Sequence, residues 1–389
     1  MRRHLFNMRP RFLLAASSLF LVCAYLVAAC GWGTLKPAGT PALNTSFAAQ
    51  ADAFLRKEVS NRLFSGVVLV TQDGRTLWSR GYSMANWEQQ VPNAPHTRFR
   101  IASVTKQFTG MAILILQEEG KLQVGDHVCK YLPYCPTVWQ TITIHEVLAH
   151  TSGIPDLPAQ TVPSSPEQAL VPYDHVPLDF PPGTRYKYSN AGYILLGYVV
   201  QQVSGVSYAS FIQQRILAPL HKNDTGFVPP SPSQPAKDLA IGYKAWQVPA
   251  SPWVYDPPLP AKMTFLYAHG YLYSTAEDLQ RWDQALFTPT LVSQRSLSAM
   301  FTPYADMCSA RSSCSAPYTA ESYGYGWEIA QEGSLHVFWH GGWHGGSGLR
   351  AYNGLYPDHK VTIIVLGNLD YTDPASIAQE LEHMLFGTT

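Results

Sequence analysis

A serine and a lysine three positions apart, Ser103 and Lys106, have the types and spacing needed for nucleophilic catalysis. A serine hydroxyl is inert until a base removes its proton, and a desolvated lysine amine with a lowered pKa can be that base. Residues 99–103 favour a strand and residues 104–119 a helix, so Ser103 would lie where free N–H groups stabilise negative charge. Lys106 would follow one turn later on the same face. The structural alternative is a helix-capping serine beside a solvated lysine.

A second polar group, Tyr188-Ser189-Asn190, lies between an expected loop and an expected helix. Residues 181–183 are Pro-Pro-Gly, which is typical of a loop, and residues 190–203 carry apolar side chains at helical spacing. A tyrosine here could act as a general base if cations held it as a phenolate, and Asn190 could orient a substrate amide. The alternative is a tyrosine that only caps a core helix.

The third group is His340-Gly341-Gly342, which follows an expected strand. Glycines at this place would let a substrate backbone lie against the strand edge. The backbone N–H groups of Trp343 and Ser103 could then form an oxyanion hole. A glycine-rich turn without such a role is the alternative.

Several other chemistries find no support in the sequence. His145-Glu146 lacks the second histidine of a zinc-binding helix, because residue 149 is alanine. Gly-x-Ser-x-Gly and the glycine-rich phosphate-binding motifs are absent. Lys+Arg 27 and Asp+Glu 27 give a net charge of zero, so we expect no nucleic-acid partner.

The rest of the sequence predicts the elements that position these groups: strands near both ends of the chain, with helices between them. The chain has 389 residues, of which 46% are hydrophobic, enough for a packed core. Strands are expected at residues 66–70, 76–80, 325–330, 335–339, 349–355 and 361–366, and a closing helix at 374–386. This order predicts an α/β (α+β) fold with one sheet completed by both chain ends. The α/β domain would comprise residues 47–120 and 263–389, and residues 121–262 would form a mostly helical insertion domain.

Taken together and in this order, the three groups resemble those of the class C β-lactamase-like serine hydrolases. That family includes β-lactamases, penicillin-binding proteins, D-Ala-D-Ala carboxypeptidases, D-aminopeptidases and esterases. Four further stretches look similar to the family: LAHTSGIPD, PGTRYKYSNAGYILLGYVVQQVSG, YLYSTAEDLQRW and YGYGWEI. The resemblance implies antiparallel strands flanked by helices, a β-lactamase/transpeptidase-like fold, with Tyr188 carried by a helical domain. It also implies an acyl-enzyme on Ser103, proton transfer shared by Lys106 and Tyr188, and neither a metal nor a cofactor.

One position departs from the pattern of the β-lactamases. They carry Lys-Thr-Gly on the edge strand, whereas the lysine position here is His340. A histidine with a pKa near 6.5 is mostly neutral at pH 7 and attracts a substrate carboxylate poorly. Esterases and peptidases of the family often show His-x-Gly. We therefore expect a small-molecule ester, peptide or β-lactam substrate, with esters and D-Ala-D-Ala-type amides favoured over β-lactams.

Two rival functions remain open at this point. A catalytically silent protein could keep the fold and bind cell-wall fragments, although intact Ser103, Lys106 and Tyr188 argue against it. A hydrolase could instead use a Ser/His/Asp triad with His150 or His340. The triad predicts that Lys106→Ala keeps most activity.

The N-terminus has the features of an export signal. An arginine-rich start precedes an apolar run over residues 12–29, so residues 1–29 are expected to be a signal peptide. The run ends Val-Ala-Ala-Cys, which resembles a bacterial lipoprotein cleavage site that would lipidate Cys30. A simple cleaved signal or an uncleaved anchor are the alternatives. Residues 30–46 have the composition of a flexible tether. With the export signal, this predicts a periplasmic or cell-surface protein that is attached to the membrane only through its N-terminus.

The cysteines agree with export. Cys129 and Cys135, and likewise Cys308 and Cys314, have five residues between them. In an oxidising compartment such pairs are typical of local disulfides, and free buried thiols are the alternative. Loops this short lose little closure entropy, so each disulfide would contribute little to global stability.

Overall fold

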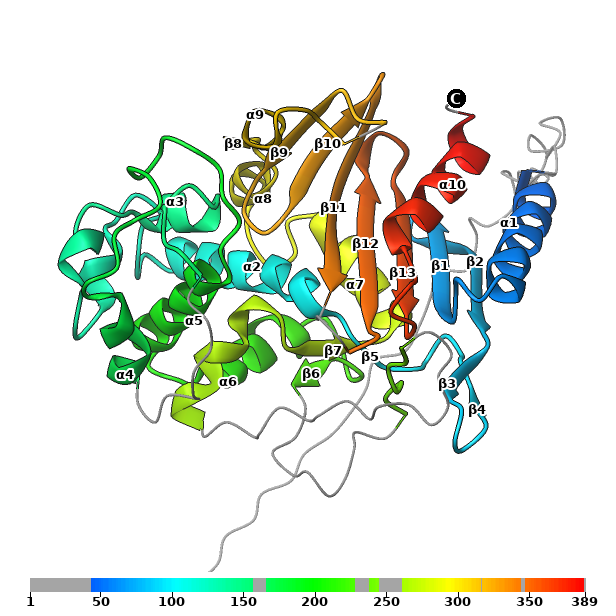
Figure 1. The fold of residues 1–389 in the computed structure, drawn as a ribbon, viewed down its shortest axis with the longest axis horizontal. Helices are drawn as coiled ribbons and strands as arrows, with labels where there is room; N and C mark the ends of the chain where they lie inside the picture. Colours follow the sequence, from blue (N-terminus) through cyan, green and yellow to red (C-terminus); the bar gives the residue numbers. More distant parts are fainter. Residues whose placement is uncertain are drawn as a thin grey trace, which may run out of the picture. The chain divides into compact units, whose positions relative to one another are not determined.

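Figure 1 shows the fold in a computed structural model, which describes residues 43–156, 166–227, 238–244, 261–315, 317–343 and 347–387. The expected signal peptide, the lipidation site Cys30 and most of the expected tether lie outside the described residues, so these stay predictions. Within the described ranges, no helix combines the length and apolar character that crossing a bilayer requires. All elements discussed below belong to the compact unit Asn44–Thr389.

An eight-stranded antiparallel sheet forms the centre of this unit, in the order β2-β1-β13-β12-β11-β10-β9-β8. Because β1 pairs with β13, the two ends of the chain complete one sheet, and the predicted fold class is confirmed. The strands are β1 (Gly66–Gln72), β2 (Arg75–Tyr82), β8 (Ala305–Asp306), β9 (Ala320–Tyr323), β10 (Glu328–Glu332), β11 (Leu335–Trp343), β12 (Arg350–Tyr356) and β13 (Val361–Gly367).

Helices cover both faces of the sheet, which explains why β13 is buried along its whole length and β1 along all but its last residue (Figure 1). Helices α1 (Leu43–Ser60) and α10 (Pro374–Phe386) pack on one face, where Val68 and Val70 point. The opposite face packs on α2 (Thr105–Glu118) and α7 (Ala276–Leu286), and Val67 points to this side. Each such side chain contributes about 1.5–3 kcal/mol by leaving water.

Helix α2 is buried on all sides rather than on one apolar face, since every residue from Thr105 to Leu116 is buried. The segment that precedes β10 packs directly against it. A Cβ atom at Gly326 would lie 2.5 Å from the carbonyl oxygen of Lys106, so only glycine fits. Gly326 turns the chain with a φ of +84°, and β10 therefore begins at Glu328, later than the sequence predicted.

The remaining elements form the helical part of the molecule and its connections to the sheet. One hydrophobic cluster includes residues of α2, α5 and β13, so this part shares a core with the sheet. The proposed division into two domains stays a prediction. The elements are α3 (Ile144–Leu148), α4 (Pro166–Leu170), α5 (Asn190–Ser204), α6 (Tyr208–Ile212), α8 (Gln294–Met300), α9 (Met307–Arg311), β3 (Met84–Asn86), β4 (Val91–Pro92), β5 (Phe99–Arg100), β6 (Gly226–Phe227), β7 (Leu272–Ser274) and the 3-10 helix η6 (Ala261–His269).

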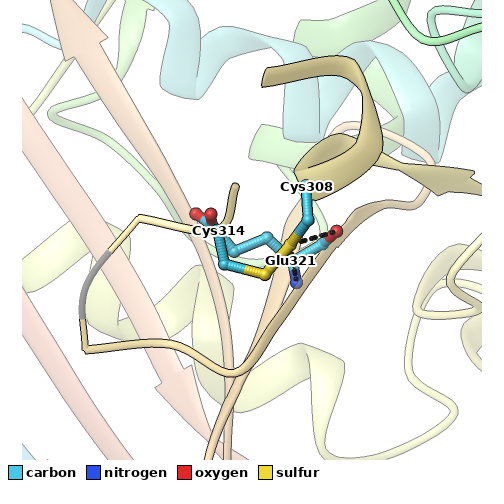
Figure 2. A group of neighbouring side chains, drawn as sticks. All are labelled: Cys308, Cys314 and Glu321. Atoms are coloured by element: carbon cyan, nitrogen blue, oxygen red, sulfur yellow. Dashed lines mark hydrogen bonds between the residues drawn. A yellow bond between two sulfur atoms is a disulfide. The ribbon is translucent and has the colours of Figure 1, made fainter. Parts of the chain in front are cut away.

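Both predicted disulfides are present, Cys129–Cys135 and Cys308–Cys314. Figure 2 shows that Glu321 lies beside the second one, with its backbone N–H donating to Cys308 Sγ at 3.2 Å. Because the two sulfurs are bonded to each other, they are not thiolates, and this group of side chains is not a metal site in the oxidised protein.

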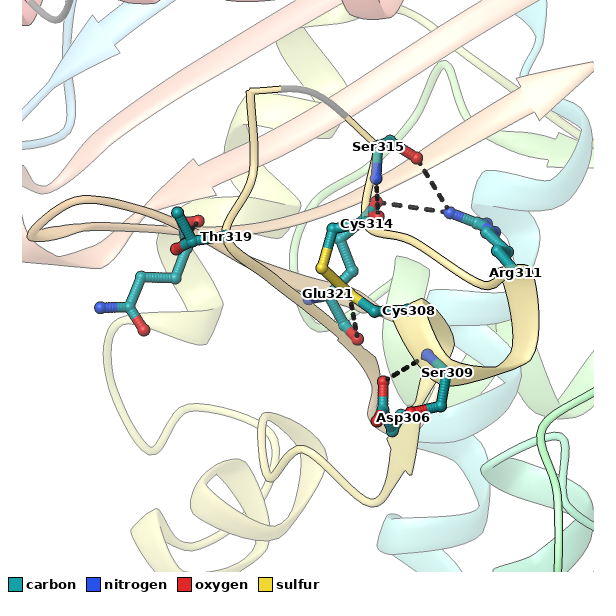
Figure 3. Close-up of a disulfide and its surroundings, with 9 residues drawn as sticks. Asp306, Cys308, Ser309, Arg311, Cys314, Ser315, Thr319 and Glu321 are labelled. Carbon is teal, nitrogen blue, oxygen red and sulfur yellow. Dashed lines mark hydrogen bonds and ion pairs between the residues drawn. A yellow bond between two sulfur atoms is a disulfide. The ribbon is translucent and has the colours of Figure 1, made fainter.

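The Cys308–Cys314 disulfide ties the chain after α9 back to that helix, beside β9 (Figure 3). The carboxylate of Glu321 accepts hydrogen bonds from the backbone N–H of Ser315 at 2.6 Å and from Arg311 at 3.4 Å. The disulfide thus shapes a local loop at the edge of the sheet, as its short span predicts.

Candidate active site

Ser103 lies in the 3-10 turn η1 (Ala102–Val104), between strand β5 and helix α2. Ala102 has a φ of +46°, a left-handed conformation that costs a non-glycine residue on the order of 1–3 kcal/mol. Such strain persists only where the surrounding structure imposes it, and it is common at functional sites. The turn leaves Ser103 partly exposed, and a substrate can therefore reach its hydroxyl.

Lys106 is fully buried, with 0% of its surface exposed, and its Nζ atom has three oxygen neighbours. These are Ser103 Oγ at 3.2 Å, Asn190 Oδ1 at 2.8 Å and the carbonyl oxygen of His269 at 2.6 Å. Burial lowers the pKa of Lys106 well below its ordinary value, and the nearby Asp156 opposes this shift. A neutral amine has two N–H donors and one lone pair. As an ammonium, Lys106 donates to all three oxygens; as a neutral amine it would donate to the amide and the carbonyl, and its lone pair would face the Ser103 hydroxyl.

Tyr188 comes from the segment before α5 and completes the group. Its hydroxyl shares a hydrogen bond with the Ser103 side chain, and its ring centre lies 4.7 Å from Lys106 Nζ. Burial among aromatic rings raises the pKa of Tyr188 well above its ordinary value, which the hydrogen bond to Ser103 only partly offsets. Lys106 contacts the ring face, and the resting side chain is a neutral phenol. The phenolate considered from the sequence is therefore not the resting form.

The ring of His150 packs against the ring of Tyr188. The centre of its buried ring lies 4.4 Å from that of Tyr188 and 4.5 Å from that of Tyr323. Its Nδ1 accepts the backbone N–H of Ser189 at 3.1 Å, so the proton of the neutral ring is on Nε2. His150 also has a left-handed backbone, with a φ of +58°. It orients the backbone next to Tyr188.

Neither histidine of the alternative triad has the partners that a triad needs. In the described part of the chain, His150 Nε2 has no hydrogen-bond partner. His340 Nδ1 donates to the carbonyl oxygen of Gly341 at 2.6 Å, and its Nε2 accepts the Tyr323 hydroxyl at 2.9 Å. Among the described residues neither ring is hydrogen-bonded to a carboxylate or to Ser103, so a His/Asp pair is not assembled.

His340 is on β11 and is 2% exposed. Burial and, secondarily, the charge of Lys106 lower its pKa from 6.5 to about 3. It is therefore neutral at physiological pH and cannot replace the permanent cation that a lysine would supply at this position.

Replacement of His340 by glutamine is expected to make stability less sensitive to acid. Because the pKa falls from 6.5 in the unfolded chain to about 3 on folding, the stabilising contribution is complete above 6.5 and is lost as pH falls toward 3. Each pH unit in that window costs about 1.4 kcal/mol through this one proton. Urea unfolding of both proteins from pH 4 to pH 7 measures the difference in slope. Equal slopes would show that His340 is not buried as a neutral ring.

Gly342 brings the end of β11 next to the nucleophile turn. A Cβ atom there would lie 2.2 Å from the carbonyl oxygen of Ile101 and 3.1 Å from the Cβ of Ala351. The strand therefore passes against the residues just before Ser103, which is where an oxyanion hole would need it. The Trp343 side chain is 60% exposed, with the Arg350 guanidinium 5.0 Å from its ring centre. The roles of the Trp343 and Ser103 N–H groups stay a proposal.

Gly342→Ala is expected to lower kcat by about 10²-fold, because the new methyl group must push β11 away from η1 and displacements near 1 Å carry this cost. Gly125→Ala is the control, since nothing lies within 4 Å of a Cβ at Gly125. Neither Gly125 nor Gly342 has a positive φ, so the two variants differ in the close contact and not in backbone strain. An unchanged kcat in Gly342→Ala would show that the close approach of β11 to η1 is not needed for catalysis.

Asp156 and the carbonyl of His269 are site components that the sequence analysis did not single out. Asp156 accepts hydrogen bonds from Ala191 N–H at 2.8 Å, Ser189 Oγ at 3.2 Å and Asn190 Nδ2 at 3.4 Å. The available signal was an aspartate closing LAHTSGIPD together with an α5 N-terminus that favours a negative charge. A backbone carbonyl such as that of His269 leaves no signal in a sequence.

Comparisons with known proteins show which family the chain resembles. The family model described as Beta-lactamase matches residues 48–384. A candidate penicillin-binding protein of Bacillus subtilis (strain 168), PbpX, is 32% identical over 252 residues, 64% of this chain and 62% of the relative. The match thus spans less than two thirds of that protein. A second relative from the same strain, named a penicillin-binding protein, is 31% identical over 343 residues, 83% of this chain and 73% of its own length.

A solved structure, described as an octameric penicillin-binding protein homologue from Pyrococcus abyssi, has a TM-score of 0.73 and 28% identity to this chain. The alignment covers 88% of this chain and 78% of that one. The family match spans nearly all of the described unit, including all three catalytic candidates. The chain therefore belongs to the beta-lactamase family, with penicillin-binding proteins among its homologues and the fold of the serine hydrolases of that type.

Proposed function

We propose that the protein is a serine hydrolase that forms an acyl-enzyme on Ser103 with an ester or amide substrate. The observation that carries the proposal is the hydrogen bonding of the buried Lys106. Its Nζ atom lies 2.8 Å from Asn190 Oδ1, 2.6 Å from the His269 carbonyl oxygen and 3.2 Å from Ser103 Oγ. In the neutral form the first two oxygens would accept its two N–H groups, and its lone pair would face the hydroxyl. A lysine held in this way is a base for one particular hydroxyl.

The proposed acylation moves two protons. Lys106 takes the hydroxyl proton while Ser103 Oγ forms a bond to the substrate carbonyl carbon, and the N–H groups of Ser103 and Trp343 stabilise the oxyanion. Collapse of this intermediate breaks the bond to the leaving group, which takes the phenol proton of Tyr188. The site then holds the acyl ester, a lysine ammonium and a phenolate whose ring lies 4.7 Å from the Lys106 nitrogen. The ion pair limits the energy of the buried charges.

Deacylation reverses the two transfers. The Tyr188 phenolate removes a proton from water as the water oxygen attacks the acyl carbon. Ser103 Oγ then leaves and recovers its proton from the Lys106 ammonium. The cycle restores every group to its starting state, and it uses the raised pKa of Tyr188, because a basic phenolate is a strong acceptor for a water proton.

Two observations bear on the substrate and favour different members of the class. His340 is neutral, so the site attracts a carboxylate-bearing β-lactam or D-Ala terminus poorly, and this favours a neutral ester. Relatives that are named penicillin-binding proteins favour a D-Ala-D-Ala-type peptidase. We place ester hydrolysis first, the peptidase second, and β-lactam hydrolysis third. A silent binding protein would have no use for a base aligned on Ser103.

A panel of three substrates tests the proposal: a short-chain nitrophenyl ester, a D-Ala-D-Ala peptide and a chromogenic cephalosporin, each assayed with purified protein and with Ser103→Ala. We expect the nitrophenyl ester to have the highest kcat/KM. Preference for the peptide would establish the second candidate, and preference for the cephalosporin would overturn the argument from His340. No turnover of any substrate and no covalent adduct would support the silent binder.

A further inference from the structure

We propose that Asp156 is a positioning residue, which fixes the orientation of the Asn190 amide so that Asn190 presents its carbonyl oxygen to Lys106. The proposal rests on the proposed function of Lys106 as the base and specifies how that base is held. Asp156 itself does not contact Ser103 or Lys106 through any hydrogen bond in the described part of the chain, so it acts through Asn190.

The geometry of the Asn190 amide carries the inference. Asn190 Oδ1 accepts from Lys106 Nζ at 2.8 Å, and Asn190 Nδ2 donates to Asp156 Oδ2 at 3.4 Å. A 180° flip of this amide would point its NH₂ group at the lysine and its oxygen at the carboxylate. The contact between the amide oxygen and the carboxylate would then be repulsive, and Lys106 would lose the acceptor of one of its N–H groups. The carboxylate therefore selects the one orientation in which Lys106 keeps an acceptor and directs its lone pair to Ser103.

A second oxygen of Asp156 performs a separate, structural task. Its Oδ1 accepts the backbone N–H of Ala191 at 2.8 Å and the hydroxyl of Ser189 at 3.2 Å, at the start of α5. These bonds anchor the carboxylate, so its other oxygen is held toward Asn190. They also provide a competing explanation, in which Asp156 does no more than cap the helix.

Asp156 is the carboxylate whose charge affects the pKa of Lys106. His150 and His340 pack nearby and are neutral, because burial lowers the pKa of both rings. The rings of Tyr188 and Tyr193 lie against Nζ, and burial raises the pKa of both phenols, so they are neutral as well. His269 faces the lysine with its carbonyl, while its ring nitrogen Nδ1 pairs with the Leu266 carbonyl. The negative charge of Asp156 raises the pKa of Lys106 and so partly offsets the lowering caused by burial.

Asp156→Asn separates positioning from capping. The asparagine oxygen can still accept the Ala191 N–H, and Asn caps a helix about as well as Asp. The atom that faces Asn190 becomes an NH₂ group, which opposes the Asn190 NH₂ and favours the flipped amide. We therefore expect Asp156→Asn to keep the melting temperature of the wild type but to lower kcat by about 10²-fold. If the residue only caps α5, Asp156→Asn has wild-type kcat, and that result overturns the proposal.

The matched control is Asp373→Asn, at the N-terminus of α10 on the opposite face of the sheet. Asp373 accepts the backbone N–H groups of Ala375 and Ser376 and has no contact with the site in the described structure. Its variant should keep kcat. A double-mutant cycle with Asn190→Ala adds a test of mechanism: once Asn190 is absent, Asp156→Asn should cause no further loss. Independent losses in the double variant would contradict action through Asn190.

The pH profile provides a readout that a structural role would not change. Loss of the carboxylate charge lowers the pKa of Lys106 further, so the acidic limb of kcat/KM in Asp156→Asn should move to lower pH. Titration of the Lys106 side chain by NMR in Ser103→Ala, with and without Asp156→Asn, measures the same coupling without turnover. If that titration shifts but Ser103→Ala retains activity, the proposed function fails while the coupling stands. If the titration and the acidic limb are unchanged, the positioning proposal fails.

Discussion

Ser103→Ala is expected to lower kcat/KM on the preferred ester by about 10⁴–10⁶-fold, the range found when a nucleophile is removed from a serine hydrolase. Without the hydroxyl, the base has no proton to take and the acyl-enzyme cannot form. Turnover of the nitrophenyl ester at saturating and subsaturating concentrations measures the loss. KM reports separately whether substrate still binds.

Ser293→Ala is the matched control for this variant. Ser293 also precedes a helix, α8, and its Oγ accepts the backbone N–H of Ser296 at 3.3 Å. Its loss should cost about 1 kcal/mol of stability and leave kcat/KM unchanged. If Ser103→Ala retains a tenth or more of the activity, another residue is the nucleophile.

Lys106→Ala is expected to lower kcat by about 10³–10⁵-fold, because it removes the base that the desolvated amine supplies. Lys106→Arg should fail as well, since a guanidinium stays protonated and cannot accept the Ser103 proton. A Ser/His/Asp triad predicts the opposite, with most activity kept in both variants. Single-turnover measurement of the acylation step with the nitrophenyl ester distinguishes the two mechanisms.

Lys222→Met controls for the removal of a buried lysine. Lys222 is 1% exposed, burial lowers its pKa to about 7, and its Nζ donates to the carbonyl oxygen of Asp278. This variant should lower the melting temperature but keep the kcat of the folded fraction. Similar losses of kcat in Lys106→Ala and Lys222→Met would mean that stability, not the base, explains the effect.

Much of the fold could be predicted from the sequence, because turn residues and the spacing of apolar residues are local signals that occur in many of its elements. Strands β1 and β2 are separated by Asp73-Gly74, both with positive φ, as the Asp-Gly turn predicts. Strand β10 was misplaced because Gly326 fits against the Lys106 carbonyl, a contact between residues far apart in the chain. Residues 43–46 belong to helix α1 although their composition resembles a tether. Tertiary packing overrides composition at such places.

The candidate site was predictable in its residue types but not in its protonation. Tyr188 comes from a segment far along the chain from Ser103 and Lys106, and the structure brings the three side chains together. The neutral state of Tyr188 depends on the rings that surround it, among them His150, which no local pattern reveals. Asp156 was missed because its partner Asn190 is 34 residues away in the chain and the contact depends on the orientation of an amide.

Peptide mapping by mass spectrometry after reaction with a fluorophosphonate probe identifies the nucleophile and shows whether Lys106 activates it. We expect one covalent adduct, on the Ser103 Oγ of the wild-type protein, formed much more slowly in Lys106→Ala and absent in Ser103→Ala. An adduct on a different residue, or undiminished labelling of Ser103 in Lys106→Ala, would contradict the claim that this lysine activates this serine.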